Sequence, residues 1–183
     1  KVLMGNNYLC ENIPNCIENH PGKNYTLNEL DNLSYDPQNC YSCEYGFKGI
    51  INYKENVHVI DSSYCFSKLD LYVLNEIIEL NNYLLSKEPL EIGNQTWKNG
   101  RLISLAINNS NLTTIPNSIS NLSSLKILHL DNNKIQYLPD NIGNLINLEE
   151  LVLDENFLSK LPESIGNLKK LRGLSIDNNK FIF

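Results

Sequence analysis

The 183-residue sequence has no long apolar run. A membrane-spanning helix needs roughly 20 nearly uninterrupted apolar residues, and the most apolar stretch, Leu69–Leu85, is broken by six acidic or amide side chains. Basic residues are also scarce, because 15 Lys and Arg stand against 21 Asp and Glu, which leaves a net charge of −6. Phosphate binding relies on a basic surface, so we expect no nucleic-acid partner. The acidic excess serves solubility or a basic protein partner.

The N-terminal residues lack the apolar core of a secretion signal, and the chain starts with Lys instead of Met. We therefore expect a mature product or a fragment rather than a complete primary translation. Catalytic motifs are missing too: the sequence has no nucleophile elbow, phosphate-binding loop, dinucleotide-binding glycine pattern or HExxH motif. We predict no enzymatic activity, no cofactor and no small-molecule substrate.

Cysteine is absent after residue 65, and the part of the chain that holds all five cysteines is rich in turn-forming Pro, Gly and Asp. The apolar residues of this segment show little periodicity. For residues 1–66 we expect a small, loop-rich module with short strands near Gly49–Tyr53 and Val57–Asp61.

Two uses of the thiols are open. Cys40 and Cys43 form a C-x2-C pair, which zinc would bind together with His20 or further cysteines. Disulfides are favoured, and no metal is predicted, because there is no second C-x2-C and the spacings match no standard finger. The odd count leaves one thiol without a partner, and the connectivity is open. The disulfide candidates are Cys10, Cys16, Cys40, Cys43 and Cys65.

The C-terminal part of the chain repeats with a period of 23 residues. One unit reads LKILHLDNNKIQYLPDNIGNLIN and the next LEELVLDENFLSKLPESIGNLKK, whereas the last, LRGLSIDNNKFIF, is shorter. Leu128 and Leu130 alternate with residues expected to be exposed, as in a short strand. A single unit cannot bury its apolar positions alone, so neighbouring units must stack. The units open at Leu102, Leu125, Leu148 and Leu171.

These units resemble the typical leucine-rich repeat, L-x-x-L-x-L-x-x-N-x-L-x-x-L-P-x-x-I-x-x-L-x-x, over residues 102–183. The resemblance implies an α/β fold: a short right-handed solenoid with a parallel concave sheet, built from three full units and one partial unit. The ninth position is polar, and its side chains are expected to bond to the backbone of adjacent turns as a structural ladder. This ladder comprises Ser110, Asn133, Asn156 and Asn179, with Ser110 in place of the usual Asn.

An amphipathic helix is predicted over Ser67–Leu85, where the apolar residues of one face recur at helical spacing: Leu69, Tyr72, Val73, Ile77, Leu80 and Leu84. We interpret it as an N-terminal cap, with Trp97 packed between the cap and the first coil. The order of helix, Trp and repeat resembles the caps of extracellular plant-type leucine-rich-repeat proteins, although only one cysteine lies near it. The expected organisation is a cysteine-rich module over 1–66, a helical cap over 67–100 and repeats over 101–183.

Solvent-facing strand positions of the repeats define the predicted partner-binding surface. Asp131, Asp154 and Asp177 form an acidic row there, and like charges in adjacent strands repel, which favours a basic or amide-rich partner. The alternative is that Asp belongs to the repeat and favours the turn before Asn. His129 near Asp131 and Asp154 would suit a general base. Exposed repeat positions are freely variable and polar, however, so we interpret His129 as an ordinary surface residue. The predicted partner-binding residues are Ala106, Ile127, His129, Asp131, Glu150, Val152, Asp154, Glu155, Ser175 and Asp177.

Six Asn-x-Ser/Thr sequons occur, and those at Asn24, Asn32 and Asn94 fall in expected loops, where glycosylation is favoured. Together with the cysteines they favour non-enzymatic protein–protein recognition by a secreted or cell-surface protein. The alternative is a cytoplasmic signalling scaffold, because the phrase LP-x-x-I-G-N-L-x-x-L resembles the Ras-group leucine-rich-repeat proteins.

Overall fold

The computed structural model describes residues 54–61 and 65–182, together with short strands near the N-terminus. Those strands are β1 (Leu3–Met4), β2 (Tyr8–Leu9), β3 (Tyr35–Asp36), β4 (Tyr41–Ser42) and β5 (Phe47–Gly49). The pairs β1–β2, β3–β4 and β5–β7 (Cys65–Ser67) are antiparallel. The first four cysteines and the sequons at Asn24 and Asn32 lie outside the described residues.

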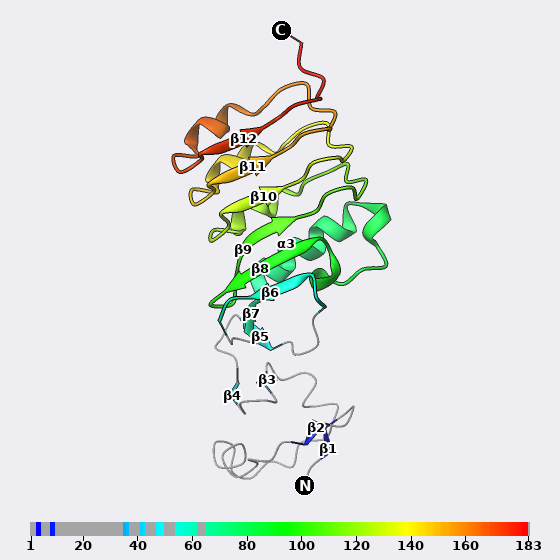
Figure 1. Cartoon of the computed structure of the whole chain (residues 1–183), viewed down its shortest axis with the longest axis vertical. Helices are drawn as coiled ribbons and strands as arrows, with labels where there is room; N and C mark the ends of the chain where they lie inside the picture. The colour runs from blue at the N-terminus through cyan, green and yellow to red at the C-terminus, as the bar shows by residue number, and fades with distance from the viewer. Residues whose placement is uncertain are drawn as a thin grey trace.

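A six-stranded sheet runs along the molecule in the order β12–β11–β10–β9–β8–β6. The four repeat strands are parallel, and adjacent strands pair with a shift of 23 residues (Figure 1). Each central leucine therefore stacks on the next, and the parallel sheet predicted for the repeats is confirmed. Its strands are β6 (Val57–Val59), β8 (Asn94–Lys98), β9 (Arg101–Ala106), β10 (Ile127–His129), β11 (Glu150–Val152) and β12 (Gly173–Ser175).

The sheet extends beyond the repeats, which the repeat pattern did not predict. β8 pairs antiparallel with β9, and β6 pairs parallel with β8. The connection between β8 and β9 is Asn99–Gly100, and both residues have positive φ, 49° and 68°. An Asn-Gly pair between two strands is the common signal for a tight hairpin, since both central residues need positive φ. Strands from residues 57–59 and 94–98 thus cover the first edge of the repeat sheet.

Each full coil returns through a short 3₁₀ helix that begins directly after a proline: η3 (Asn117–Asn121), η4 (Asp140–Asn144) and η5 (Glu163–Asn167). Between these helices and the sheet lies the core. Gly143 is required by this stacking, because a Cβ at that position would lie 2.2 Å from the backbone oxygen of Ser164. The core side chains of the second coil are at most 5% exposed: Leu125, Leu128, Leu130, Ile135, Leu138, Ile142 and Leu145.

Helix α3 (Lys68–Glu79) packs against this core, but it is shorter than the predicted helix over Ser67–Leu85. It ends where Asn81 leaves the helical path: the Asn81 amide donates to the backbone oxygens of Ile77 (2.7 Å) and Thr114 (2.9 Å). The short helices η1 (Asn82–Leu84) and η2 (Pro89–Glu91) follow. A buried polar side chain therefore ends the helix and ties it to the first coil.

The buried face of α3 also differs from the expected one. Leu69, Tyr72 and Leu80 were expected on the apolar face but are about half exposed, at 48%, 53% and 49%. The face that packs inward is instead centred on Leu74 and Ile77, and it includes the charged Asp70. Among the described residues, no helix combines the length and apolar character that a membrane crossing demands.

Trp97 on β8 is fully buried, as its expected place between cap and coils requires. Its ring meets Phe66 edge-on at 4.9 Å, and its indole N–H donates to the Gln95 side chain at 3.0 Å. Cys65, at the start of β7, is disulfide-bonded, and its partner lies outside the described residues. The aromatic pair and the disulfide thus lie at the same end of the repeat array.

Candidate functional site

The outward positions of β9 to β12 and the turns that follow them form one surface, here called the sheet face. In β10 the central Leu128 is buried, whereas Ile127 and His129 on either side are partly exposed. The strand register aligns equivalent positions of successive coils, so that Ile127 lies beside Glu150. The same register aligns Ala106, His129, Val152 and Ser175 in one column.

This column has little bulk apart from His129. The His129 ring nitrogen Nε2 lies 3.1 Å from Glu150 Oε1, so the carboxylate that pairs with His129 is Glu150, not Asp131 or Asp154 as the sequence suggested. Gly173 leaves room for Glu150, because a Cβ there would lie 3.3 Å from Glu150 Cγ. The Glu150 side chain is therefore placed between the histidine and the glycine, and it is 46% exposed.

The acidic row (Asp131, Asp154 and Asp177) is not uniform. Both carboxylate oxygens of Asp154 accept from the Ser175 hydroxyl at 2.7 Å, and one also accepts from the Asp177 N–H at 2.6 Å. In the preceding coil the residue equivalent to Ser175 is Val152, which cannot donate. Within the described chain, the Asp131 carboxylate accordingly makes no hydrogen bond or ion pair. Asp154 is thus committed to the fold, and Asp131 is available to a ligand.

Glu155 stands in the turn directly after β11, with φ of 53°. The equivalent residues of the other coils are Asn109, Asn132 and Asn178, with φ of 54° to 55°. Asparagine adopts this left-handed conformation readily, but glutamate does so at a cost on the order of 1 kcal/mol. The third coil therefore keeps an exposed carboxylate where an amide would be the easier choice.

The ninth-position side chains lie inside the coils. The Asn133 amide donates to the backbone oxygens of Ile107 (2.7 Å) and Leu130 (2.9 Å), and its oxygen accepts from the Ser110 and Leu112 N–H groups. Asn156 and Asn179 repeat this pattern one and two coils later. Ser110 contributes less, because its hydroxyl donates only to Asn108 O, at 2.9 Å. The three asparagines join adjacent coils, and Asn133 and Asn156 are buried, so they do not face solvent as a binding site would.

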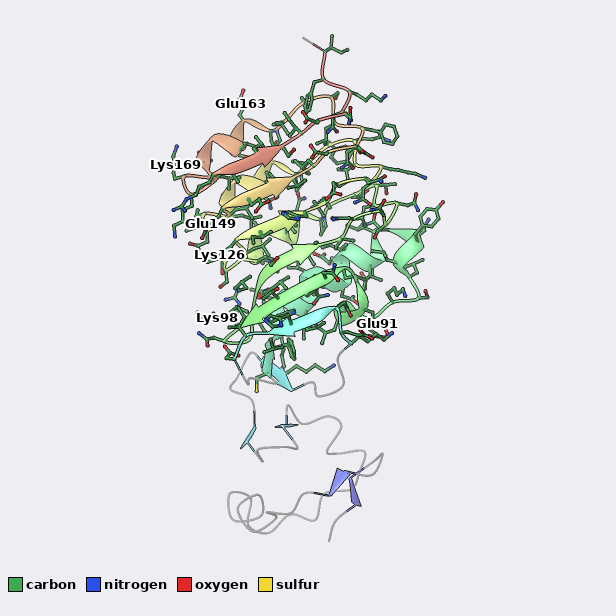
Figure 2. The ribbon with its side chains drawn as sticks, viewed as in Figure 1. Glu91, Lys98, Lys126, Glu149, Glu163 and Lys169 are labelled. Carbon is green, nitrogen blue, oxygen red and sulfur yellow. The ribbon has the colours of Figure 1, made fainter. Side chains whose placement is uncertain are left out.

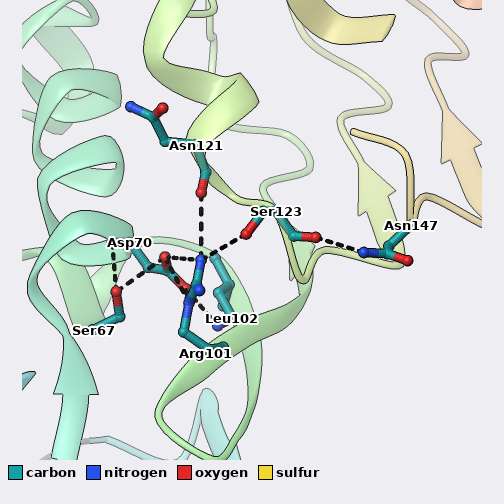
Figure 3. Close-up of polar contacts among 7 residues, drawn as sticks. All are labelled: Ser67, Asp70, Arg101, Leu102, Asn121, Ser123 and Asn147. Carbon is teal, nitrogen blue, oxygen red and sulfur yellow. Dashed lines mark hydrogen bonds and ion pairs between the residues drawn. The ribbon is translucent and has the colours of Figure 1, made fainter. Parts of the chain in front are cut away.

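A buried ion pair connects helix α3 to the repeats, and no sequence motif singled it out. Asp70 has no exposed surface. Its carboxylate accepts from Arg101 Nε at 3.0 and 3.1 Å, from the Leu102 N–H at 2.8 Å and from the Ser67 hydroxyl at 3.2 Å (Figure 3). Arg101 Nη2 also reaches the Ser123 hydroxyl at 3.1 Å, in the turn that ends the first coil. Asp70 thus joins α3 to β9.

A local signal for this site was nevertheless present in the sequence. Ser67 and Asp70 are three residues apart, the spacing of a helix capping pair. The Ser67 hydroxyl accepts from the Asp70 N–H at 3.3 Å and so caps α3. In the sequence, Asp70 was interpreted only as one of the polar residues that interrupt the apolar stretch Leu69–Leu85.

The remaining expectations concern glycosylation and metal binding. Asn94 was expected in a loop but is the first residue of strand β8; its side chain is exposed, whereas Asn108, in another sequon, is half-buried. In the part of the chain that the structure describes, no group of three or more His, Cys, Asp or Glu side chains is arranged to hold a metal ion. The residues of the zinc alternative, Cys40 and Cys43 with Cys10, Cys16 or His20, fall outside that part.

The stacked coils with their shared register and internal Asn ladder correspond to a known architecture. A family model described as a leucine-rich repeat region matches residues 65–181. The chain belongs to the leucine-rich repeat family. The match includes the cap helix as well as the coils. Members of this family are generally binding proteins without enzymatic activity, and the repeat region points to protein–protein interaction.

Several solved structures are similar to the chain. A leucine-rich repeat protein of Leptospira interrogans is 31% identical, with 48% of this chain and 21% of that chain covered and a TM-score of 0.43. The BIR3–SERK2 complex of Arabidopsis thaliana is 32% identical, with 44% of this chain and 45% of that chain covered and a TM-score of 0.41. The functional domain of InlJ from Listeria monocytogenes is 33% identical, with 45% of this chain and 17% of that chain covered and a TM-score of 0.41. The chain therefore spans less than half the length of each of these three structures, and no curated protein matches it.

Proposed function

We propose that the sheet face binds a protein partner that presents a basic side chain, and that the chain acts in this way in a secreted or cell-surface protein. The observation that carries the proposal is the Asp131 carboxylate, which has no partner among the described residues. Two residues before Asp131, His129 pairs across the sheet with Ala106 and Val152, which are small and apolar. A Lys or Arg side chain can lay its aliphatic stem on Val152 and bring its charge to Asp131.

Glu150 and Glu155 support the same partner chemistry. Glu150 is 46% exposed beside the column, and Glu155 is exposed in the turn after β11, in a backbone conformation that favours Asn. Strain of this kind persists where a site requires the side chain. Asp154 contributes by supporting Asp177 and Ser175 rather than by contact with the partner.

Two observations support an extracellular setting. Cys65 is disulfide-bonded, and disulfides persist in oxidising compartments. The Asn94 sequon is exposed. Mass spectrometry of the unreduced protein, purified from its native source, tests the setting. We expect disulfide-linked cysteines and a glycan on Asn94, whereas five free thiols would favour the cytoplasmic scaffold instead.

The binding proposal is tested by selecting phage-displayed random peptides on the purified protein and measuring the affinity of the best peptide. We expect selected peptides rich in Lys and Arg, and a loss of at least about tenfold in affinity for Asp131→Asn, since a charge-assisted hydrogen bond is removed.

Asp140→Asn is the matched control, because Asp140 is an exposed aspartate on η4, away from the sheet face. It removes the same charge and should leave affinity unchanged. Equal effects of the two substitutions, or selected peptides without basic residues, would contradict the proposal.

A further inference from the structure

The coils have a second distinctive surface at the side where the chain leaves the sheet. There, aromatic rings and lysines alternate from the cap to the last coil. Tyr83, Tyr137 and Phe157 are 67%, 57% and 46% exposed. We call this surface the lysine–aromatic edge, and it consists of Tyr83, Lys134, Tyr137, Phe157, Lys160 and Lys180.

Cation–π contacts and backbone hydrogen bonds position the side chains of this edge. Lys134 Nζ lies over the Tyr83 ring, 5.8 Å from its centroid, and Lys180 Nζ lies over the Phe157 ring at 5.7 Å. Both distances are those of a cation–π interaction. Backbone hydrogen bonds from Lys134, Phe157 and Lys180 to the preceding coils, at 2.7 to 2.9 Å, hold the three residues at equivalent positions. The alternation of cation and ring is therefore built by the register of the coils.

The positive charge of this edge is uncompensated. Across residues 54–61 and 65–182, no carboxylate pairs with Lys134, Lys160 or Lys180, and all three are exposed. On the opposite edge, by contrast, Lys126 pairs with Glu149 at 2.8 Å, and the two side chains point toward one another (Figure 2). This hydrogen bond lowers the pKa of the Glu149 carboxyl. Within the described residues, Lys134, Lys160 and Lys180 thus put three lysines without a carboxylate partner on this one edge of the coils.

The geometry points to an acidic segment of a partner protein as the ligand of the lysine–aromatic edge. We infer that its carboxylates bind Lys134 and Lys180 while an apolar side chain packs on Phe157 between them. Lys134 and Lys180 are two coils apart, which is about 10 Å at the usual strand spacing. Carboxylates three residues apart on an extended chain span a similar distance. A uniform polyanion would bind the lysines but would leave the exposed rings uncovered. A surface of both lysines and rings therefore favours a peptide that carries both acidic and apolar side chains.

The probe is a fluorescein-labelled peptide that repeats Glu-Phe-Ser-Glu, and binding to the full chain is followed by fluorescence anisotropy. Lys134→Glu/Lys180→Glu should weaken binding by about tenfold or more, because attraction becomes repulsion. Phe157→Ser should weaken it too, as should replacing Phe by Ser in the peptide. The matched control is Lys126→Glu/Lys170→Glu on the opposite edge, which makes the same change in net charge and should leave binding unchanged.

Three results would overturn the inference: no saturable binding of the peptide, equal effects of the two double variants, or tighter edge-dependent binding of a heparin fragment or single-stranded oligonucleotide than of the peptide. Circular dichroism checks that each variant is folded. The inference does not rest on the sheet face, so Asp131→Asn should leave this peptide's affinity unchanged.

Discussion

Asp70 and Asp131 are both aspartates of this chain, but their surroundings give them opposite roles. Asp70 is completely buried, and Arg101, the Leu102 N–H and Ser67 satisfy its carboxylate. Asp131 is partly exposed and has no partner in the described part of the molecule. A buried charge must be paired to be tolerated, whereas an unpaired exposed charge is available for binding. Asp70 therefore serves stability, and Asp131 serves the proposed recognition.

Arg101→Met should destabilise the protein by roughly 2–3 kcal/mol, because it leaves the Asp70 carboxylate buried without its cation. The expected loss is below that of a fully buried pair, because the Arg101 side chain is 28% exposed. Urea unfolding measures the change.

Lys126→Met is the control for this prediction. Its partner is the exposed Glu149, and exposed pairs contribute about 0–1 kcal/mol. If the two substitutions lowered the free energy of unfolding equally, the assigned role of Asp70 would be wrong.

At the scale of elements, the repeat coils and the presence of a helix before them followed from the sequence, but the end of that helix did not. The 23-residue period placed the strands and the Asn ladder, because each feature recurs in every coil. The end of α3 depends on Asn81, which bonds to Thr113 and Thr114 some 32 to 33 residues away. Such a contact occurs once and leaves no period to detect. A short strand was expected within Val57–Asp61 and is present as β6, but its place in the repeat sheet, like that of β8, depends on tertiary pairing that leaves no period either.

Gly143→Ala tests the packing of the 3₁₀ helices. The added methyl would lie 2.2 Å from Ser164 O, so a loss of about 1–3 kcal/mol is expected from overpacking. At Gly166, one coil later, an added methyl would have nothing within 4 Å, so Gly166→Ala should change the thermal unfolding midpoint little. Similar midpoints for the two variants would show that η4 and η5 are not packed as closely as described.

At the scale of the whole molecule, one stack of coils carries two surfaces of opposite charge. The sheet face holds unpaired carboxylates, and the lysine–aromatic edge holds unpaired ammonium groups. Sequence periodicity placed the sheet-face columns, but it did not show that Asp154 is committed to Ser175 while Asp131 is not. It also missed the lysine–aromatic edge, because lysine and aromatic residues alternate between coils instead of repeating in each.

The most direct test of recognition by the sheet face is a charge swap between Asp131 and its ligand. The affinity of the selected basic peptide is measured for wild type and for Asp131→Arg, and again with the peptide's contacting Lys or Arg replaced by Glu. Repulsion should lower the affinity of Asp131→Arg for the basic peptide by about 100-fold, and the Glu-containing peptide should recover most of that loss. If Asp131→Arg bound both peptides with wild-type affinity, the claim that this face recognises a basic partner would be contradicted.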